Sequence, residues 1–187
     1  MMSLNEYLLR SADVVREAAS SVEQEAMDKA VSLCVQAFKA KKPLLVCGNG
    51  GSAADAMHIA GELVARFKKE RAGQNCLCLC DNPAMLTAWS NDYDYASVFA
   101  RQVEAYGGEG AVLLGLSTSG NSPNVLLAFE QARKMGLRTI GMTGLGGGKM
   151  AVLSDVLLQA PSNDTPLIQQ VHICLYHYLC ERIEMAL

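Results

Sequence analysis

The chain has 187 residues, 50% of them hydrophobic and 6% aromatic, so it is long enough to bury the core of one domain. Its formal net charge of −3, with Lys and Arg scattered along the sequence, argues against nucleic-acid binding. The sequence lacks both the roughly 18–20-residue apolar run of a membrane span and the apolar segment of a signal peptide. We expect a cytoplasmic protein that binds neither nucleic acid nor a membrane.

Residues 4–40 have a helical pattern of apolar side chains that breaks near Ser20-Ser21, which predicts two helices. This segment precedes the first expected strand and has no strand partner of its own. Amphipathic helices attached outside an α/β core often pack against another subunit. We expect residues 1–40 to make oligomer contacts, and packing on their own domain is the alternative.

Strand and helix patterns alternate from Pro43 to the C-terminus. The expected strands cover residues 44–47, 76–80, 111–116, 138–142 and 155–159, and the expected helices cover 53–68, 83–90, 95–106, 123–135, 149–153 and 165–185. Strands separated by helices predict a parallel sheet with right-handed crossovers. The sequence therefore predicts one α/β domain over residues 1–187. It is a three-layer sandwich in which helices cover both faces of a five-stranded parallel sheet, with an N-terminal helical extension.

The seven cysteines are odd in number and lack the paired spacing of a zinc site. Cys76, Cys78 and Cys80 alternate along one expected strand, so their side chains should share a face. Most of the others lie inside apolar runs. We interpret all seven as reduced thiols of the core, in agreement with a cytoplasmic location.

The strand expected at 44–47 ends in a glycine-rich loop, Gly48-Asn49-Gly50-Gly51-Ser52, which opens onto a helix. Glycines let the backbone turn sharply and approach a ligand, and the free N–H groups of a helix start attract anions. The loop has neither the Gly-Lys-Ser/Thr ending of a Walker motif nor the G-x-G-x-x-G pattern of a dinucleotide site. It therefore favours the phosphate of a small molecule over a nucleotide.

A second polar loop, Ser117-Thr118-Ser119-Gly120-Asn121-Ser122, follows the strand expected at 111–116 and opens onto Pro123. Because the carboxyl ends of parallel strands meet at one edge of a sheet, both loops should lie together there. Hydroxyls and free amides at a helix start suit a phosphate dianion. The alternative is an ordinary turn in which Ser122 caps the helix.

His58 and Glu62 are four residues apart on the helix after the first loop, so their side chains share one face. A polar face on a surface helix is the alternative account. The last helix adds Gln169, His172 and His177 within an apolar run. The two histidines of this helix are about 140° apart, so both cannot point into one site. Gln169 aligns best with His172, but His177 is still within reach, and the spacing does not choose between them.

Five segments together resemble the bacterial phosphoheptose isomerases of the sugar isomerase (SIS) superfamily. They are CGNGGSAADAMHIAGEL, the Asn91-Asp92-Tyr93 triplet, GLSTSGNSPNVL, TGLGGGKM and IQQVHICLYHYLCERIE. The resemblance runs from about Leu44 to the C-terminus. The Ser/Thr loop alone is typical of any SIS phosphosugar domain. A more specific signal is the combination of HxxxE at His58 and Glu62 with Gln169 and His177, which are eight residues apart on the last helix.

The resemblance implies a SIS-type fold and the conversion of D-sedoheptulose 7-phosphate to D-glycero-D-manno-heptose 7-phosphate, the first step toward the heptose of lipopolysaccharide core or related glycans. It also implies a cytoplasmic homotetramer with sites between subunits and one Zn²⁺ per subunit. The zinc-binding positions of the family correspond here to His58, Glu62, Gln169 and His177. The resemblance therefore selects His177 over His172. Glu62 and His177 also match the catalytic acid/base pair of the family. The substrate-binding positions correspond to Asn49, Gly50, Gly51, Ser52, Glu62, Asn91, Asp92, Ser117, Thr118, Ser119, Ser122 and Gln169.

The chain departs from the family pattern without losing any of these ligands. Asp94 replaces a usual Gly, Trp89 replaces a smaller aliphatic residue, and Gln170 replaces a usual Glu. Leu145-Gly146 and Pro166-Leu167 stand where polar or charged residues are common. These departures bear on the identity of the sugar phosphate more than on the type of reaction.

Three other functions are alternatives to a heptose phosphate isomerase. A non-catalytic SIS protein that binds the replication initiator is the first, but such relatives have lost the carboxylate and histidine that Glu62 and His177 supply here. An isomerase of another ketose phosphate is the second. A sugar-phosphate sensor is the third, although such sensors usually carry a DNA-binding module that this sequence lacks.

Overall fold

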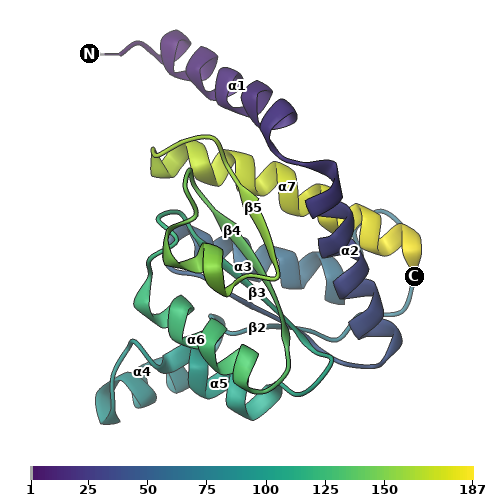
Figure 1. Ribbon diagram of the computed structural model, residues 1–187. Helices are drawn as coiled ribbons and strands as arrows, with labels where there is room; N and C mark the ends of the chain where they lie inside the picture. Colours follow the sequence, from purple (N-terminus) through teal and green to yellow (C-terminus); the bar gives the residue numbers. More distant parts are fainter. Residues whose placement is uncertain (1) are drawn as a thin grey trace.

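The computed structural model describes residues 2–187 and contains a five-stranded sheet whose neighbouring strands are all parallel (Figure 1). The strands are β1 (Leu44–Cys47), β2 (Cys76–Cys78), β3 (Val112–Ser117), β4 (Arg138–Thr143) and β5 (Val156–Gln159), in the spatial order β2-β1-β3-β4-β5. Every residue of β1 and β3 is buried, as expected where helices cover both faces. The predicted parallel α/β sheet is confirmed.

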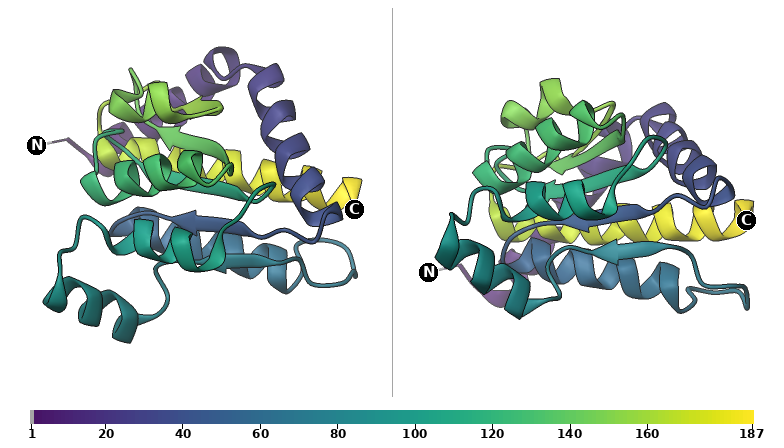
Figure 2. Two further views of the ribbon diagram at one scale, coloured as in Figure 1. Left: turned by 60° about the horizontal axis from the view of Figure 1, so that its bottom comes forward. Right: turned by 90° about the horizontal axis from the view of Figure 1, so that it is seen from below.

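Helices form a layer on each face of this sheet, as Figures 1 and 2 show. They are α1 (Leu4–Ser21), α2 (Gln24–Lys39), α3 (Gly51–Val64), α4 (Pro83–Asp92), α5 (Val98–Tyr106), α6 (Pro123–Lys134), the 3₁₀ helix η1 (Gly148–Leu153) and α7 (Thr165–Ala186). Leu44 and Val46 of β1 join the core with α2, α3 and α7, whereas Leu45 and Cys47 join the core with α5 and α6. Across residues 2–187, none of the helices combines the length and apolar character that a membrane crossing requires.

The two N-terminal helices pack differently. α2 lies against the sheet and buries seven of its residues, among them Phe38. α1 extends beyond the other elements (Figure 1) and buries only Ala18. Two apolar side chains on α1, Leu4 and Leu8, are 74% and 56% exposed. Packing on the chain's own core therefore applies to α2, whereas α1 presents an apolar face outside that core.

Several element boundaries differ from the predicted ones. α3 runs from Gly51 to Val64 rather than from residue 53 to 68, and α5 begins at Val98 rather than at residue 95. The helix predicted near 149–153 is a 3₁₀ helix over 148–153. The strand predicted over 76–80 ends at Cys78. At the C-terminus of α3, Arg71 from the following loop donates to the carbonyls of residues 62, 63 and 65, which have no partner within the helix.

The seven cysteines are all unpaired in the described part of the chain. Five of them are buried: Cys34, Cys47, Cys76, Cys78 and Cys180. Burial raises the pKa of the Cys180 thiol to about 12, so this group stays protonated at neutral pH. The prediction of core thiols is confirmed for these five. It is wrong for Cys174, which is exposed on α7, and Cys80 is half-buried in the turn after β2.

Candidate functional site

The two predicted loops meet at one edge of the sheet because β1 and β3 are parallel neighbours, with Cys47 paired to Gly115. Between the loops lies a cavity of about 310 Å³, which we call the loop pocket. It is lined by Asn49, Gly50, Gly51, Ser52, Leu116, Ser117, Thr118, Ser122, Thr165 and Gln169. Most of the predicted substrate-binding residues therefore share one pocket. Ser119 is exposed outside its lining and accepts a hydrogen bond from the N–H of Asn121.

Glycine is required where the first loop approaches α7. Gly50 has φ 55°, in the left-handed region that disfavours other residues. A Cβ atom on Gly51 would lie 2.6 Å from the Nε2 atom of Gln169, so a larger side chain would displace that amide. Gly51 is also the first residue of α3, whose N-terminal N–H groups favour an anion. The loop thus brings backbone donors and the Gln169 amide to the same pocket.

Asn49 is held by two residues that the sequence analysis did not single out. Asn49 and Asn124 exchange two amide hydrogen bonds of 2.9 and 2.8 Å, and the Tyr95 hydroxyl donates to Asn49 Oδ1 over 3.0 Å. These bonds occupy the Asn49 carbonyl oxygen and one of its two amide hydrogens, which leaves one N–H for a ligand. Asn124 lies within the segment GLSTSGNSPNVL and Tyr95 lies two residues after the Asn91-Asp92-Tyr93 triplet, but local spacing does not reveal which side chains meet.

The second polar loop, residues 117–122, is organised by hydrogen bonds between side chains. The Ser117 and Ser122 hydroxyls lie 2.8 Å apart, and the Thr118 hydroxyl lies 3.3 Å from that of Thr165. Ser122 occupies the N-cap position of α6, but its hydroxyl bonds to Ser117 and caps no N–H of the helix. The simple capping interpretation of Ser122 is therefore wrong. The hydroxyls face the loop pocket together with the start of α6, an arrangement suited to an oxyanion.

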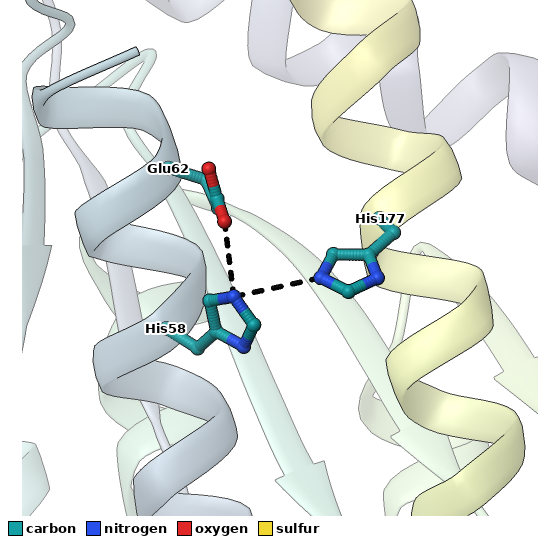
Figure 3. A group of neighbouring side chains, drawn as sticks. All are labelled: His58, Glu62 and His177. Carbon is teal, nitrogen blue, oxygen red and sulfur yellow. Dashed lines mark hydrogen bonds and ion pairs between the residues drawn. The ribbon is translucent and has the colours of Figure 1, made fainter. Parts of the chain in front are cut away.

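A second polar group lies farther along α3. His58 Nε2 is 3.0 Å from Glu62 Oε1 and 3.5 Å from His177 Nε2 (Figure 3). One ligand atom from each residue lies within 4.8 Å of the other two. We call this set the His–Glu group. Two imidazole nitrogens and a carboxylate oxygen on facing helices are a donor set that zinc prefers, with room for a further ligand.

His172 lies elsewhere and serves the fold. It is fully buried, and its Nε2–H donates to the carbonyl of Thr143 at the end of β4 over 3.0 Å. Burial lowers its pKa below the ordinary value, so the ring is neutral. The structure thus places His177, rather than His172, beside His58 and Glu62.

Three predicted site residues lie away from the His–Glu group. Gln169 lines the loop pocket and stands eight residues before His177 on α7, which is about 12 Å along the helix axis. Asn91 and Asp92 are exposed at the end of α4, where the Asn91 amide donates to the Asp92 carboxylate over 2.9 Å. Neither of them lines the loop pocket. Within one chain, the predicted residues therefore form separate clusters.

Two further residues, Tyr176 and Asp55, were not predicted; Tyr176 contacts His58, and Asp55 contacts Tyr176. Tyr176 on α7 is fully buried, and its hydroxyl lies 3.0 Å from His58 Nδ1 and 3.3 Å from Asp55 Oδ1. Burial raises the pKa of Asp55, although the Tyr176 hydroxyl and His58 lower it in part. Burial, together with the nearby Asp55 carboxylate, also raises the pKa of Tyr176. The imidazole of His58 is thus bonded at both nitrogens.

The loop after α3 is fixed beside His177 by a buried ion pair. Glu184 accepts hydrogen bonds from the N–H groups of residues 67–69 and lies 3.2 Å from the Arg71 guanidinium. Burial alone would raise the pKa of Glu184, but these donors and Arg71 lower it below its ordinary value. The Phe67 ring consequently stacks on His177, with 5.6 Å between ring centroids. Glu184 and Arg71 were not predicted, because their partners are distant in sequence.

Comparisons with known proteins agree with this architecture. The SIS domain family matches residues 6–144. The chain is 45% identical to phosphoheptose isomerase of Crocosphaera subtropica over 98% of its length and 94% of that protein. It is 50% identical to phosphoheptose isomerase of Helicobacter pylori over 86% of its length and 84% of that protein.

Solved structures give the same result in three dimensions. The structure of phosphoheptose isomerase from Neisseria gonorrhoeae superposes with a TM-score of 0.92 at 37% identity, covering 97% of each chain. The Francisella tularensis phosphoheptose isomerase superposes with a TM-score of 0.93 at 33% identity, covering 97% of this chain and 96% of that one. From the sheet, the two loops, the His–Glu group and these relatives, it follows that the chain belongs to the phosphoheptose isomerase family of SIS-domain proteins.

Proposed function

We propose that this protein isomerises D-sedoheptulose 7-phosphate to D-glycero-D-manno-heptose 7-phosphate, which supplies the heptose of lipopolysaccharide core or related glycans. The observation that carries this proposal is the position of Glu62 beside His58 and His177, on the same helix α3 whose start forms the loop pocket. A phosphate site and a proton-transfer group therefore share one element. The relatives named phosphoheptose isomerase support the choice of a heptose phosphate.

The residue types suit aldose–ketose isomerisation. This reaction moves a proton between neighbouring carbons through an enediol(ate), and it also transfers protons at the two oxygens. A carboxylate such as Glu62 takes the carbon-bound proton, while His177 exchanges a proton with an oxygen. The hydroxyls of Ser117, Thr118 and Ser122 would hold the phosphate together with the helix starts. Direct substrate contacts by Asn91 and Asp92 stay a prediction, because both lie outside the loop pocket of their own chain.

The His–Glu group fits one Zn²⁺ per subunit, which His58, Glu62 and His177 would hold. A bound zinc ion would polarise the substrate carbonyl or fix the groups around it. Gln169 is the fourth predicted ligand, but its amide lies against Gly51. Because Gln169 and His177 are about 12 Å apart along α7, one ion would not bind both from the same helix without rearrangement.

This separation supports an assembly in which one subunit completes the site of another. A Gln169 amide from a second copy would supply the fourth ligand, in a homotetramer with its sites between subunits. The exposed apolar side chains of α1, such as Leu4 and Leu8, offer a contact surface for a second copy.

We also propose that residues 1–187 form a single SIS domain located in the cytoplasm. The buried residues of α2, α3 and α7 belong to one continuous core with the sheet, which supports one folding unit. The seven unpaired cysteines are typical of a reducing compartment.

The test is an isomerisation assay of the purified protein with sedoheptulose 7-phosphate, in which aldose product is followed with and without a chelator. We expect turnover that chelation abolishes and zinc restores. Turnover that is indifferent to the chelator would support the isomerase and argue against a zinc requirement. Absence of turnover in the presence of zinc would contradict the proposal, and the same assay with hexulose and pentulose phosphates would then test for an isomerase of another ketose phosphate.

A further inference from the structure

A line of polar atoms connects Asp55 to the His–Glu group across two helices. The Tyr176 hydroxyl lies 3.3 Å from Asp55 Oδ1 and 3.0 Å from His58 Nδ1, and His58 Nε2 lies 3.0 Å from Glu62 Oε1. Tyr176 is fully buried. The second oxygen of Asp55 is also buried, and it has no hydrogen-bond partner among the described residues. The line therefore begins at a half-buried carboxylate and ends at the group that Figure 3 shows.

When both carboxylates are ionised and the imidazole is neutral, one contact in this line lacks a proton. The line contains three short contacts, but the Tyr176 hydroxyl and a neutral imidazole supply only two protons, since both carboxylates only accept. If Tyr176 donates to His58, then Asp55 receives no proton. If Tyr176 donates to Asp55, the His58 Nδ1–H donates to Tyr176. The lone pair of His58 Nε2 then faces a lone pair of the Glu62 carboxylate, and no proton lies between them. A positive charge between Nε2 and Glu62, either a metal ion or a second proton on the imidazole, satisfies all three contacts.

We propose that Asp55 and Tyr176 are positioning residues that hold His58 as its Nδ1–H tautomer when a divalent cation occupies the His–Glu group. In this state Tyr176 donates to Asp55, His58 donates to Tyr176, and the Nε2 lone pair is directed at the cation. This inference rests on the proposed metal centre and deepens it. Histidine ligands commonly depend on such partners, and losing one typically costs about 10–100-fold in metal affinity.

The first test measures zinc affinity of the purified apoprotein by competition with a chromophoric chelator. We expect Tyr176→Phe and Asp55→Asn each to weaken zinc binding by about 10-fold or more. Two matched controls make the same chemical changes away from the site. The first is Tyr178→Phe on the same helix, where the Tyr178 hydroxyl accepts a hydrogen bond from Arg182. The second is Asp28→Asn, which removes an exposed carboxylate on α2. We expect both controls to bind zinc within about twofold of the parent protein.

A second measurement reads the tautomer directly and requires no variant. Long-range ¹H–¹⁵N NMR of the zinc-loaded protein should show the His58 proton on Nδ1. A proton on Nε2, or a Tyr176→Phe protein that folds and binds zinc like Tyr178→Phe, would overturn the inference while leaving the metal centre intact. If the parent protein binds no zinc at all, the metal centre itself fails, and the inference fails with it. If Tyr176→Phe does not fold, the Asp55→Asn variant and the NMR measurement on the parent protein still test the inference.

Discussion

At the scale of single residues, the site is defined by which atoms face one another. Glu62 is on α3, one turn beyond His58, and its side chain is 21% exposed. His177 reaches the same space from α7, where Phe67 stacks against its ring. The loop pocket uses different residues, at the start of α3 and of α6. The proposed phosphate site and the proposed proton-transfer group are therefore separable by mutation.

Glu62→Gln should reduce turnover by about 10²–10⁴-fold, because an amide cannot accept the carbon-bound proton. Binding of the sugar phosphate should change little, since the loop pocket keeps all of its donors. Steady-state kinetics in excess zinc and calorimetric titration of the substrate would measure the two effects separately.

Glu104→Gln is a matched control on α5, where Glu104 pairs with the exposed Arg101. It should leave both quantities unchanged. Near-normal turnover of Glu62→Gln would show that Glu62 is not the base.

At the scale of elements, α7 connects the site to the sheet. Its buried face carries Tyr176 and Ile183 into the core, while His172 donates to β4 and Glu184 fixes the loop after α3. The histidine bond is the second one to the last carbonyl of β4, Thr143, which also accepts the N–H of Ala160 over 2.8 Å, and it ties α7 to the strand end just before the glycine-rich turn. One helix thereby sets the position of His177 relative to α3 and to the strand ends.

The buried His172 should make the protein less stable in mild acid. Its pKa is lowered in the folded protein, so below about pH 6.5 the unfolded chain binds a proton that the folded protein excludes. The free energy of unfolding should therefore fall as the pH drops below about 6.5, with up to about 1.4 kcal/mol per pH unit from this one group.

Urea unfolding of the parent and of His172→Gln between pH 7.5 and 5, at fixed protein concentration, would measure this slope. The variant should be less stable at pH 7.5 but should lose less stability toward pH 5, because glutamine does not titrate. Equal slopes for the two proteins would contradict the assignment.

At the scale of the whole molecule, one chain does not bring every predicted site residue together. Gln169 belongs to the loop pocket, whereas His58, Glu62 and His177 form their own group. α1 extends away from the sheet (Figure 1), and it carries exposed apolar side chains. An ion pair of 3.1 Å joins Arg10 on α1 to Asp164, the N-cap residue of α7. Both features fit a chain that functions in an assembly of copies.

Replacing Leu4 and Leu8 together by Lys should dissociate or shrink this assembly. The two side chains are one turn apart on α1 and 74% and 56% exposed, so charging them should disrupt a contact without damaging the core. Light scattering coupled to gel filtration would give the mass.

Val152→Lys, at an 81% exposed position on η1, is the control and should keep the parent mass. If the double variant also keeps the parent mass, α1 is not an oligomer contact. If its mass falls and zinc affinity falls with it, a second subunit completes the site as proposed.

The sequence alone determined the order of strands and helices, the parallel sheet and the two loops at its edge. These features follow from local patterns, namely apolar strands, glycine-rich turns, and polar loops that open onto helices. They place Asn49 and Ser117 in one pocket because parallel strands end at the same edge. The helical spacing also placed His58 and Glu62 on one face, which is itself a local feature.

Only the tertiary structure decided which side chains meet. The spacing on α7 left His172 and His177 open, and only the family resemblance favoured His177. The packing of α7 supplies the physical reason, because it buries His172 against β4 and directs His177 toward α3. Residues such as Tyr176 and Glu184 contact partners more than a hundred positions away in the sequence, which no local pattern encodes. The end of α3 also differs from the prediction, and there the carbonyls of the last turn accept from Arg71, which lies outside the helix but only six to nine positions further along the chain.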